Sequence, residues 1–151
     1  MKTKELKISA IENGTVIDHI PANQTFKVVK ILELGKHENI VSIATNLPSK
    51  ELGKKGIVKI ADKQLTQEQV DKIAIIAPDA TLNIIRNFTV EKKVNVKTPE
   101  LVEKIIKCSN PVCITNKQPV RTKFHVINKE PLKVLCHYCE RVMLKDDIEI
   151  R

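Results

Sequence analysis

The chain has 151 residues, 42% of them hydrophobic, which suffices for the core of one average domain or two small ones and excludes disorder as its main state. It carries 26 Lys and Arg against 18 Asp and Glu, a net charge of +8, but no Trp, one Tyr and three Phe. Single-strand nucleic-acid binders stack bases on aromatic side chains, so this composition argues against that class. No apolar run reaches the length of a membrane span or a signal-peptide core, and we expect a cytoplasmic protein with neither a membrane nor a nucleic acid as partner.

The spacing of apolar residues predicts the first elements of the chain. Residues 6–10 alternate between apolar and polar, and residues 15–20 form a second extended segment. Pro21 suits the first turn of a helix, because its missing N–H is not needed there. An apolar stripe begins at Phe26, and Gly35 suits the end of the helix.

The next stretch repeats this alternation of strand and helix. Residues 40–47 and 57–60 are rich in β-branched side chains and are expected to pair as antiparallel strands. Residues 66–77 start with a capping box, follow helical spacing and stop before Pro78. Residues 81–90 are predicted to be a final strand. The order is that of a ferredoxin-like βαββαβ fold, an α+β domain in which two helices cover one face of the sheet and the other is free for a partner.

The composition of the sequence changes at Thr98. Thr98 and Pro99 resemble the start of a helix, which the apolar spacing extends over residues 101–106. We therefore expect one domain over residues 1–98 and a smaller one over residues 99–151. Short strands are predicted in the second at residues 123–127, 132–135 and 148–150.

All four cysteines lie in this second part. Cys108 and Cys113 are separated by four residues, Cys136 and Cys139 by two, and 22 residues separate the pairs. Two close pairs on tight turns can place four thiolates around one Zn²⁺, and so small a segment rarely folds on apolar burial alone. The spacing predicts a structural zinc site in a zinc-ribbon β domain, with two disulfides or four unrelated thiols as the alternatives. His125 and His137 are interpreted as non-ligands.

Several strings resemble one known family. They are GTVIDHIPA at residues 14–22, NLPS at residues 46–49 and the cysteine pattern with YCE at residues 138–140. In this order they are similar to the regulatory chain of aspartate carbamoyltransferase over essentially the whole chain. The resemblance implies a non-catalytic subunit of pyrimidine biosynthesis whose N-terminal domain binds nucleoside triphosphate effectors (CTP, ATP, UTP). Its zinc domain would dock on catalytic trimers, which regulatory homodimers, joined through the N-terminal domain, would bridge.

The resemblance also assigns roles to single residues. Lys59 and Lys93 match ribose and phosphate contacts, Asp18 matches an acceptor of ribose hydroxyls, and His19 lies near the phosphates. Lys55 matches a position linked to a second nucleotide bound with a metal ion, for which Mg²⁺ is expected. The implied effector residues are Ile8, Ile11, Val16, Asp18, His19, Ser49, Lys55, Lys59, Asn83, Ile85, Phe88, Val90 and Lys93. Three positions depart from the family's usual residues and leave the preferred nucleotide open: Ser9, Ile84 and Phe88.

In the zinc domain, Asn110 and Glu140 match residues that contact the catalytic chain, whereas Val112 stands where an asparagine is often found. The alternative from another class is a zinc-ribbon nucleic-acid-binding module, motivated by the net charge and the four cysteines. An enzyme is the third option, but no nucleophile–base pair and no glycine-rich phosphate loop supports it.

Overall fold

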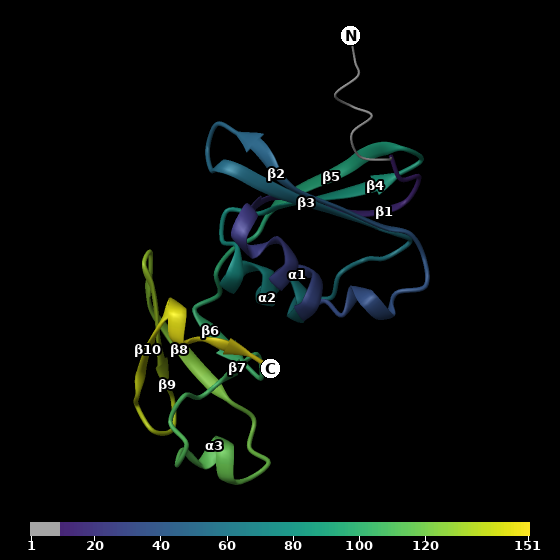
Figure 1. Ribbon diagram of the computed structural model, residues 1–151. Coiled ribbons are helices and arrows are strands. Elements are labelled where there is room, and N and C mark those ends of the chain that lie inside the picture. Colours follow the sequence, from purple (N-terminus) through teal and green to yellow (C-terminus); the bar gives the residue numbers. More distant parts are fainter. Residues whose placement is uncertain (1–9) are drawn as a thin grey trace. The chain divides into compact units, whose positions relative to one another are not determined.

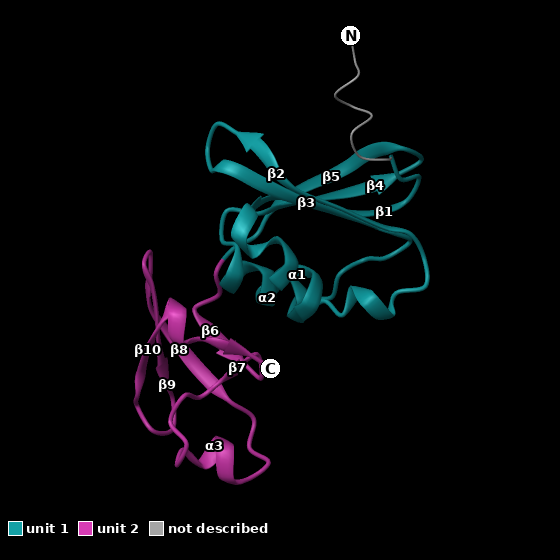
Figure 2. Ribbon diagram, in the orientation of Figure 1, with its two compact units in different colours: residues 1–97 teal, residues 98–151 magenta. Residues whose placement is uncertain are grey.

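The computed structural model describes residues 10–151. The chain divides into two compact units, residues 1–97 (unit 1) and residues 98–151 (unit 2), shown in different colours in Figure 2. Each unit has its own sheet and its own core, and each is described separately below. Within residues 10–151, no helix is long and apolar enough to cross a membrane.

Unit 1 is built on a five-stranded sheet with the order β2-β3-β1-β4-β5, in which every neighbouring pair is antiparallel. Its strands are β1 (Gly14–Pro21), β2 (Val41–Ser49), β3 (Gly53–Ala61), β4 (Thr81–Arg86) and β5 (Thr89–Asn95). Its helices are α1 (Thr25–Ile31) and α2 (Gln67–Ile76), with 3-10 turns at Ala22–Gln24 and Leu34–Lys36. The order of the first four strands is that of the expected ferredoxin-like α+β fold, which is confirmed.

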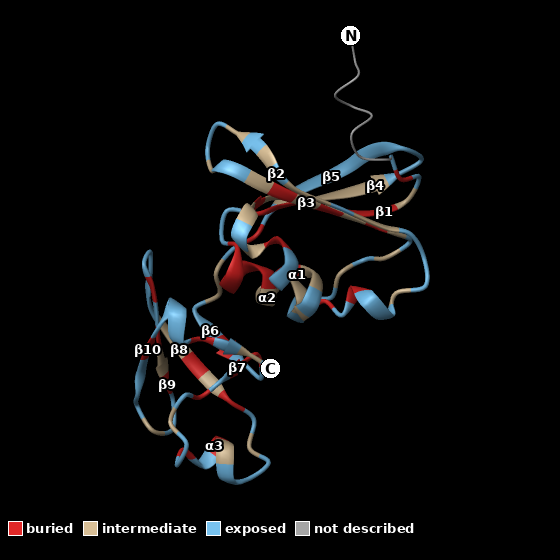
Figure 3. Cartoon of the chain, in the orientation of Figure 1, coloured by how far each residue is buried: buried red, intermediate tan, exposed pale blue. Residues whose placement is uncertain are grey.

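Both helices lie on one side of this sheet (Figure 1). On that side Ile17 of β1 stands opposite Val58 of β3 and Leu82 of β4, and all three are buried. Val28 of α1 and Ile73 of α2 are fully buried (Figure 3). Because side chains alternate along a strand, the residues between these buried ones point to the opposite side, here called the open face.

Three expectations for unit 1 need correction. Pro21 ends β1 and caps the 3-10 turn at Ala22–Gln24, and α1 begins only at Thr25. Phe26 is 64% exposed, because the side of α1 that faces the core carries Thr25 and Val28. Residues 81–90 are not one strand: Asn87 and Phe88 both have positive φ and turn the chain into a hairpin between β4 and β5. The strand predicted over residues 6–10 lies outside the described residues, apart from Ala10.

Unit 2 contains a four-stranded antiparallel sheet with the order β10-β9-β8-β6 and a separate pair, β11-β7. Its strands are β6 (Leu101–Glu103), β7 (Ile106–Lys107), β8 (Lys123–Lys129), β9 (Leu132–Cys136), β10 (Val142–Leu144) and β11 (Glu149–Ile150), with one short helix, α3 (Ile114–Lys117). Phe124, Val134 and Met143 are buried in its core.

The helix predicted over residues 101–106 is wrong. The segment forms β6 and β7 instead, and Lys104 between them has a left-handed φ of 71° that a helix would not allow. Val102 pairs with Phe124 of β8, so a contact distant in sequence overrides the local helical spacing. The three short strands expected near the C-terminus are present as β8, β9 and β11, whereas α3 and β10 were not predicted.

Candidate metal centre and effector site

The four cysteines come from two turns of unit 2. Cys108 follows β7, and Cys113 precedes the first turn of α3 and donates its amide to Asn110 O at 3.0 Å. Cys136 ends β9, and Cys139 lies in the turn before β10. That turn is closed by the amide of Glu140, which donates to Cys136 O at 3.0 Å with a left-handed φ of 60° at Glu140.

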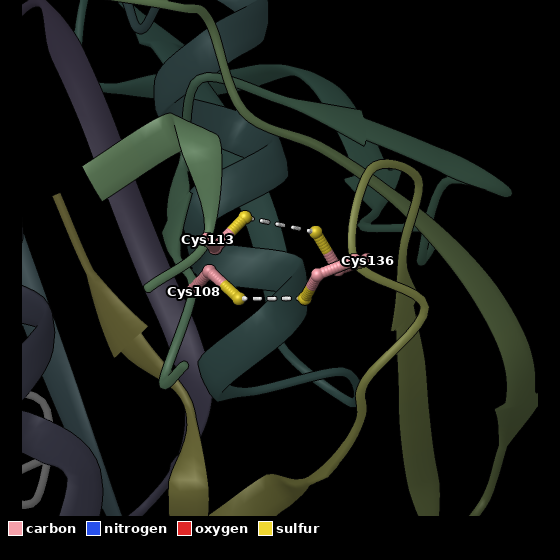
Figure 4. A group of neighbouring side chains, drawn as sticks. Cys108, Cys113 and Cys136 are labelled. Carbon is pink, nitrogen blue, oxygen red and sulfur yellow. Dashed lines mark hydrogen bonds between the residues drawn. The ribbon is translucent and has the colours of Figure 1, made fainter. Parts of the chain in front are cut away.

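The four sulfur atoms lie within 4.8 Å of one another, close enough for all four to bind one metal ion. Figure 4 shows Cys108, Cys113 and Cys136 pointing toward a common centre. The separations are 3.6 Å from Cys108 Sγ to Cys139 Sγ and 3.8 Å from Cys113 Sγ to Cys136 Sγ. Ligands about 2.3 Å from a tetrahedral Zn²⁺ lie about 3.8 Å apart, whereas a disulfide requires about 2.05 Å. The cluster therefore fits one structural zinc ion, and all four thiols are free of disulfides.

The surroundings of the cluster orient the thiols and shift their acidity. Burial raises the pKa of Cys108 to about 12 and also raises that of Cys136. At Cys139 burial is outweighed by hydrogen bonds from the Arg141 backbone, the Asn110 side chain and the neighbouring thiols, which lower the pKa to about 7. Zn²⁺ would hold all four as thiolates, since a coordinating thiol is deprotonated.

Two residues that support this cluster were not predicted. Thr115 is buried and donates its hydroxyl to Cys113 Sγ at 3.2 Å. Asn116 donates its amide to the carbonyls of Cys108 at 2.9 Å and Asn110 at 2.8 Å. Such partners of ligand residues hold a metal site in shape. Only their position two and three residues after Cys113 could have indicated them.

In unit 1 the register of the sheet places four predicted effector residues side by side on four adjacent strands. Val16 of β1 stands opposite Lys59 of β3 and Asn83 of β4, and Asn83 stands opposite Lys93 of β5. We call these four the cross-strand row. The row lies on the open face, next to the buried row through Ile17, so one residue from each of four strands points away from the helices.

Asp18 lies beside the row on the open face, two positions after Val16 on β1 and opposite Thr81, with basic residues around it. Lys55 Nζ lies 3.0 Å from Asp18 Oδ1, and both side chains are about four-fifths buried (19% and 20% exposed). His19 sits in a β-bulge with a φ of 59°, its amide donates to Asp18 Oδ1 at 2.6 Å, and its Nδ1 is 3.1 Å from the hydroxyl of Thr81. The bulge turns the imidazole toward the open face, where its Nε2 is 3.6 Å from Glu51 Oε1.

A cleft of about 560 Å³ opens beside these groups. His19, Thr81 and Lys93 line it from the sheet, and Glu51 and Asp79 line it from neighbouring loops. Its size is within the range of small-molecule sites. Burial lowers the pKa of Lys59, and the negative charge of Asp18 opposes that shift.

Apolar residues lie at the other end of the open face. Ile85 follows Asn83 by two positions on β4 and stands opposite Val90 of β5. Phe88, 64% exposed, lies at the tip of the β4–β5 hairpin, and its amide donates to Glu12 O at 2.9 Å. Ile11 is buried just before β1. The face therefore changes from charged to apolar along its length.

The remaining predicted residues lie elsewhere. Ser49 ends β2, and its hydroxyl accepts a hydrogen bond from the Leu52 amide at 3.2 Å, so it closes the β2–β3 turn. Ile8 and Ser9 lie outside the described residues. Thr81 was not predicted, although it stands opposite Asp18 and strand alternation places it on the same face as Asn83.

The predicted contacts to a catalytic chain lie at the metal cluster. Asn110 turns its side chain inward, accepting from the Val112 amide at 3.1 Å and donating to Cys139. Val112 is 72% exposed and Glu140 is exposed in the facing turn. The two turns that carry the thiols thus also present Val112 and Glu140 to solvent.

Comparison with known proteins covers both units. Residues 6–97 match the family described as aspartate carbamoyltransferase regulatory chain, allosteric domain, and residues 100–149 match its metal binding domain. The chain is 58% identical over 146 residues to an aspartate carbamoyltransferase regulatory chain from Pyrococcus horikoshii, covering 95% of this chain and 96% of that one. It is 48% identical over 150 residues to the regulatory chain from Parabacteroides distasonis, covering 99% and 97%.

Proposed function

Since the chain belongs to the family of aspartate carbamoyltransferase regulatory chains, an allosteric and non-catalytic family, we propose how its residues divide that work. Residues 1–98 bind a nucleoside triphosphate on the open face, and residues 99–151 dock on the catalytic chain. The observation that carries this proposal is the cross-strand row, which places Lys59 and Lys93 on one face with Asn83 between them.

The chemistry of the open face supports a nucleotide. A triphosphate carries several negative charges, and it is attracted by the ammonium group of Lys93, which lines the cleft, and by that of Lys59 on the same face. Asp18, an ionised acceptor without a donor, suits ribose hydroxyls. The apolar end formed by Ile85, Val90 and Phe88 suits a base, with Val16 and Ile11 beside it. His19 then lies toward the phosphates, because it lines the cleft with Lys93.

Lys55 and Ser49 are proposed to serve a second nucleotide next to the first, with Mg²⁺ between the phosphates. The ion pair between Lys55 and Asp18 supports a link between the two positions, since a ribose that takes over Asp18 would release the Lys55 ammonium. The same reasoning predicts that the second nucleotide binds only after the first.

The docking role rests on the turns that hold the thiols. Glu140 and Val112 are exposed beside the cluster, and Asn110 links the two turns. Zinc removal would unfold this surface, because the metal holds the two turns together. Val112 in place of the family's asparagine would exchange a polar contact for apolar burial.

Dimerisation through unit 1 is proposed to use β2, an edge strand without a charged residue between Val41 and Ser49. Edge strands that must stay unpaired usually carry charges, as β5 does at Glu91 and Lys93. Ile43 on β2 is 40% exposed. Ile43→Lys should convert a dimer into a monomer in sedimentation experiments, and a dimer that persists would exclude this strand.

The decisive experiment combines calorimetry with assembly. Titration of the zinc-loaded chain with CTP, UTP and ATP, with and without Mg²⁺, should show binding that Lys59→Gln weakens. Added to catalytic trimers, the chain should make aspartate saturation depend on the bound nucleotide, by a coupling of about 1–3 kcal/mol. Saturation curves that no nucleotide changes would contradict the coupling, and binding that Lys59→Gln leaves intact would contradict the site.

A further inference from the structure

Two histidines of unit 2 contact each other outside the thiol cluster. His125 Nε2 lies 3.0 Å from His137 Nδ1, and the ring centroids are 5.2 Å apart with an angle of 40° between the ring planes. Neither ring belongs to the four-cysteine group, and the contact is exposed to solvent. The pair has no part in the effector site or in the thiolate site.

The backbone around the pair sets its position. His125 lies in the middle of β8, opposite Leu101 of β6 and Leu135 of β9. His137 directly follows Cys136, and its amide donates to the carbonyl of Lys123 at 2.9 Å. The two imidazoles are therefore carried by one strand and by the turn that follows its neighbour, both tied by backbone hydrogen bonds.

Neighbouring side chains also restrict the rings. The ring of Tyr138 meets that of His137 edge-on, with centroids 5.1 Å apart and an angle of 88°. The pair of Phe124 and Cys136 is fully buried on the core side of the same two strands, so the histidines are confined to the outer side. Less side-chain freedom remains to be lost when a ligand binds to such a restricted pair.

The distance between the two nitrogens matches that between two ligands of one metal ion. Imidazole nitrogens bind transition metals at about 2.0–2.1 Å, so two of them at a right angle around an ion lie about 2.9 Å apart. Each ring would turn by up to about 45°, because the two nitrogens now face each other and a shared ion would lie to the side of the line that joins them. The hydrogen bond between the rings uses one N–H, and when a metal replaces it each neutral ring keeps its proton on its other nitrogen.

We propose that His125 and His137 form a second metal site of unit 2, one that takes a divalent transition metal ion. Imidazole suits Zn²⁺, Cu²⁺ and Ni²⁺, and a right angle between ligands suits the square or octahedral geometries of Cu²⁺ and Ni²⁺. Water fills the remaining positions, so the ion is exchangeable. In this the site differs from the buried four-thiolate cluster, which leaves no open position on its ion.

Nickel is the best probe, because Cu²⁺ would also attack the thiolates. We would titrate the zinc-loaded full chain with Ni²⁺ by calorimetry and compare His125→Gln, His137→Gln and the double variant. The expected result is one Ni²⁺ per chain, bound at least about tenfold more weakly by each single variant. The double variant should lose less than the product of the two single losses, because either substitution alone already abolishes chelation.

His37→Gln is the matched control, since His37 Nε2 contacts the carbonyl of Ala61 in unit 1 and has no imidazole partner there. It should bind Ni²⁺ like the unchanged chain. Zinc content is measured in every variant, so that loss of the thiolate site is seen separately. If a variant does lose zinc, paramagnetic broadening by Ni²⁺ in NMR spectra of the unchanged chain decides the matter. Broadening centred on His125 and His137 supports the proposal, whereas no binding, broadening centred elsewhere or a single variant that binds normally overturns it.

Discussion

Replacing one cysteine of the cluster should unfold unit 2 and leave unit 1 folded. The core of unit 2 rests on a few side chains such as Phe124, Val134 and Met143. A core of that size supplies about 3–5 kcal/mol, whereas a structural zinc ion contributes about 10–16 kcal/mol of apparent folding energy. Without the metal, unit 2 loses the larger of these two contributions, and a segment this small rarely folds on apolar burial alone. Cys136→Ser should therefore behave like the chelated chain.

Amide hydrogen exchange read by mass spectrometry measures this directly. In Cys136→Ser, amides of β8 and β9 should exchange as in an unfolded chain, while those of β1 and β3 in unit 1 should remain protected. Ser109→Ala, an exposed change beside Cys108, is the control and should retain both zinc and protection. A metal-free chain that keeps β8 paired with β9 would refute the reasoning, because it would mean that apolar burial alone sustains unit 2.

Other predictions concern unit 1. Lys93→Gln should weaken CTP binding about fivefold in calorimetry, since an exposed ammonium contributes modestly, and an unchanged affinity would place the phosphates elsewhere. Because burial lowers the pKa of Lys59, its positive charge is lost at a lower pH than that of an ordinary lysine, so CTP affinity should fall earlier on the alkaline side than in Lys59→Arg. Gly56→Ala would overlap the hydroxyl of Thr25 and place a methyl group 2.8 Å from its Cβ, and should cost about 1–3 kcal/mol in urea unfolding. The cost should shrink in a Thr25→Ala background, and an equal cost there would contradict the clash. Thr66→Ala removes the hydroxyl that accepts the Gln69 amide and should lower the stability of unit 1 by about 1 kcal/mol, which an unchanged urea midpoint would disprove.

Elements with strong local signals could be predicted from the sequence. The capping box of Thr66 and Gln69 forms as expected at the start of α2, because both hydrogen bonds close within one turn. The cysteine cluster was also predictable, since each pair lies within a single turn and the metal requires all four thiols together. In the capping box the determining contacts join residues close in sequence, and in the cluster they are required by the metal ion.

The failures occurred where distant contacts decide. Residues 101–106 have apolar spacing that fits a helix, but pairing with β8 makes them strands. The turn at Asn87 and Phe88 carries no glycine, and its two left-handed residues are held by Glu12 and Asn13, far away in the sequence. Individual effector residues could be named through a family resemblance, but their alignment across four strands depends on register, which no local pattern encodes.

The cross-strand row limits where the chain can change in length. Each of its four members comes from a different strand, so an inserted or deleted residue inside any one strand would rotate that member's side chain to the helix side. Length changes in the turns, such as the β2–β3 turn, would leave the alignment intact. Related chains should therefore differ in length at their turns while the spacing from Val16 to the start of β1 and from Asn83 to the start of β4 stays constant.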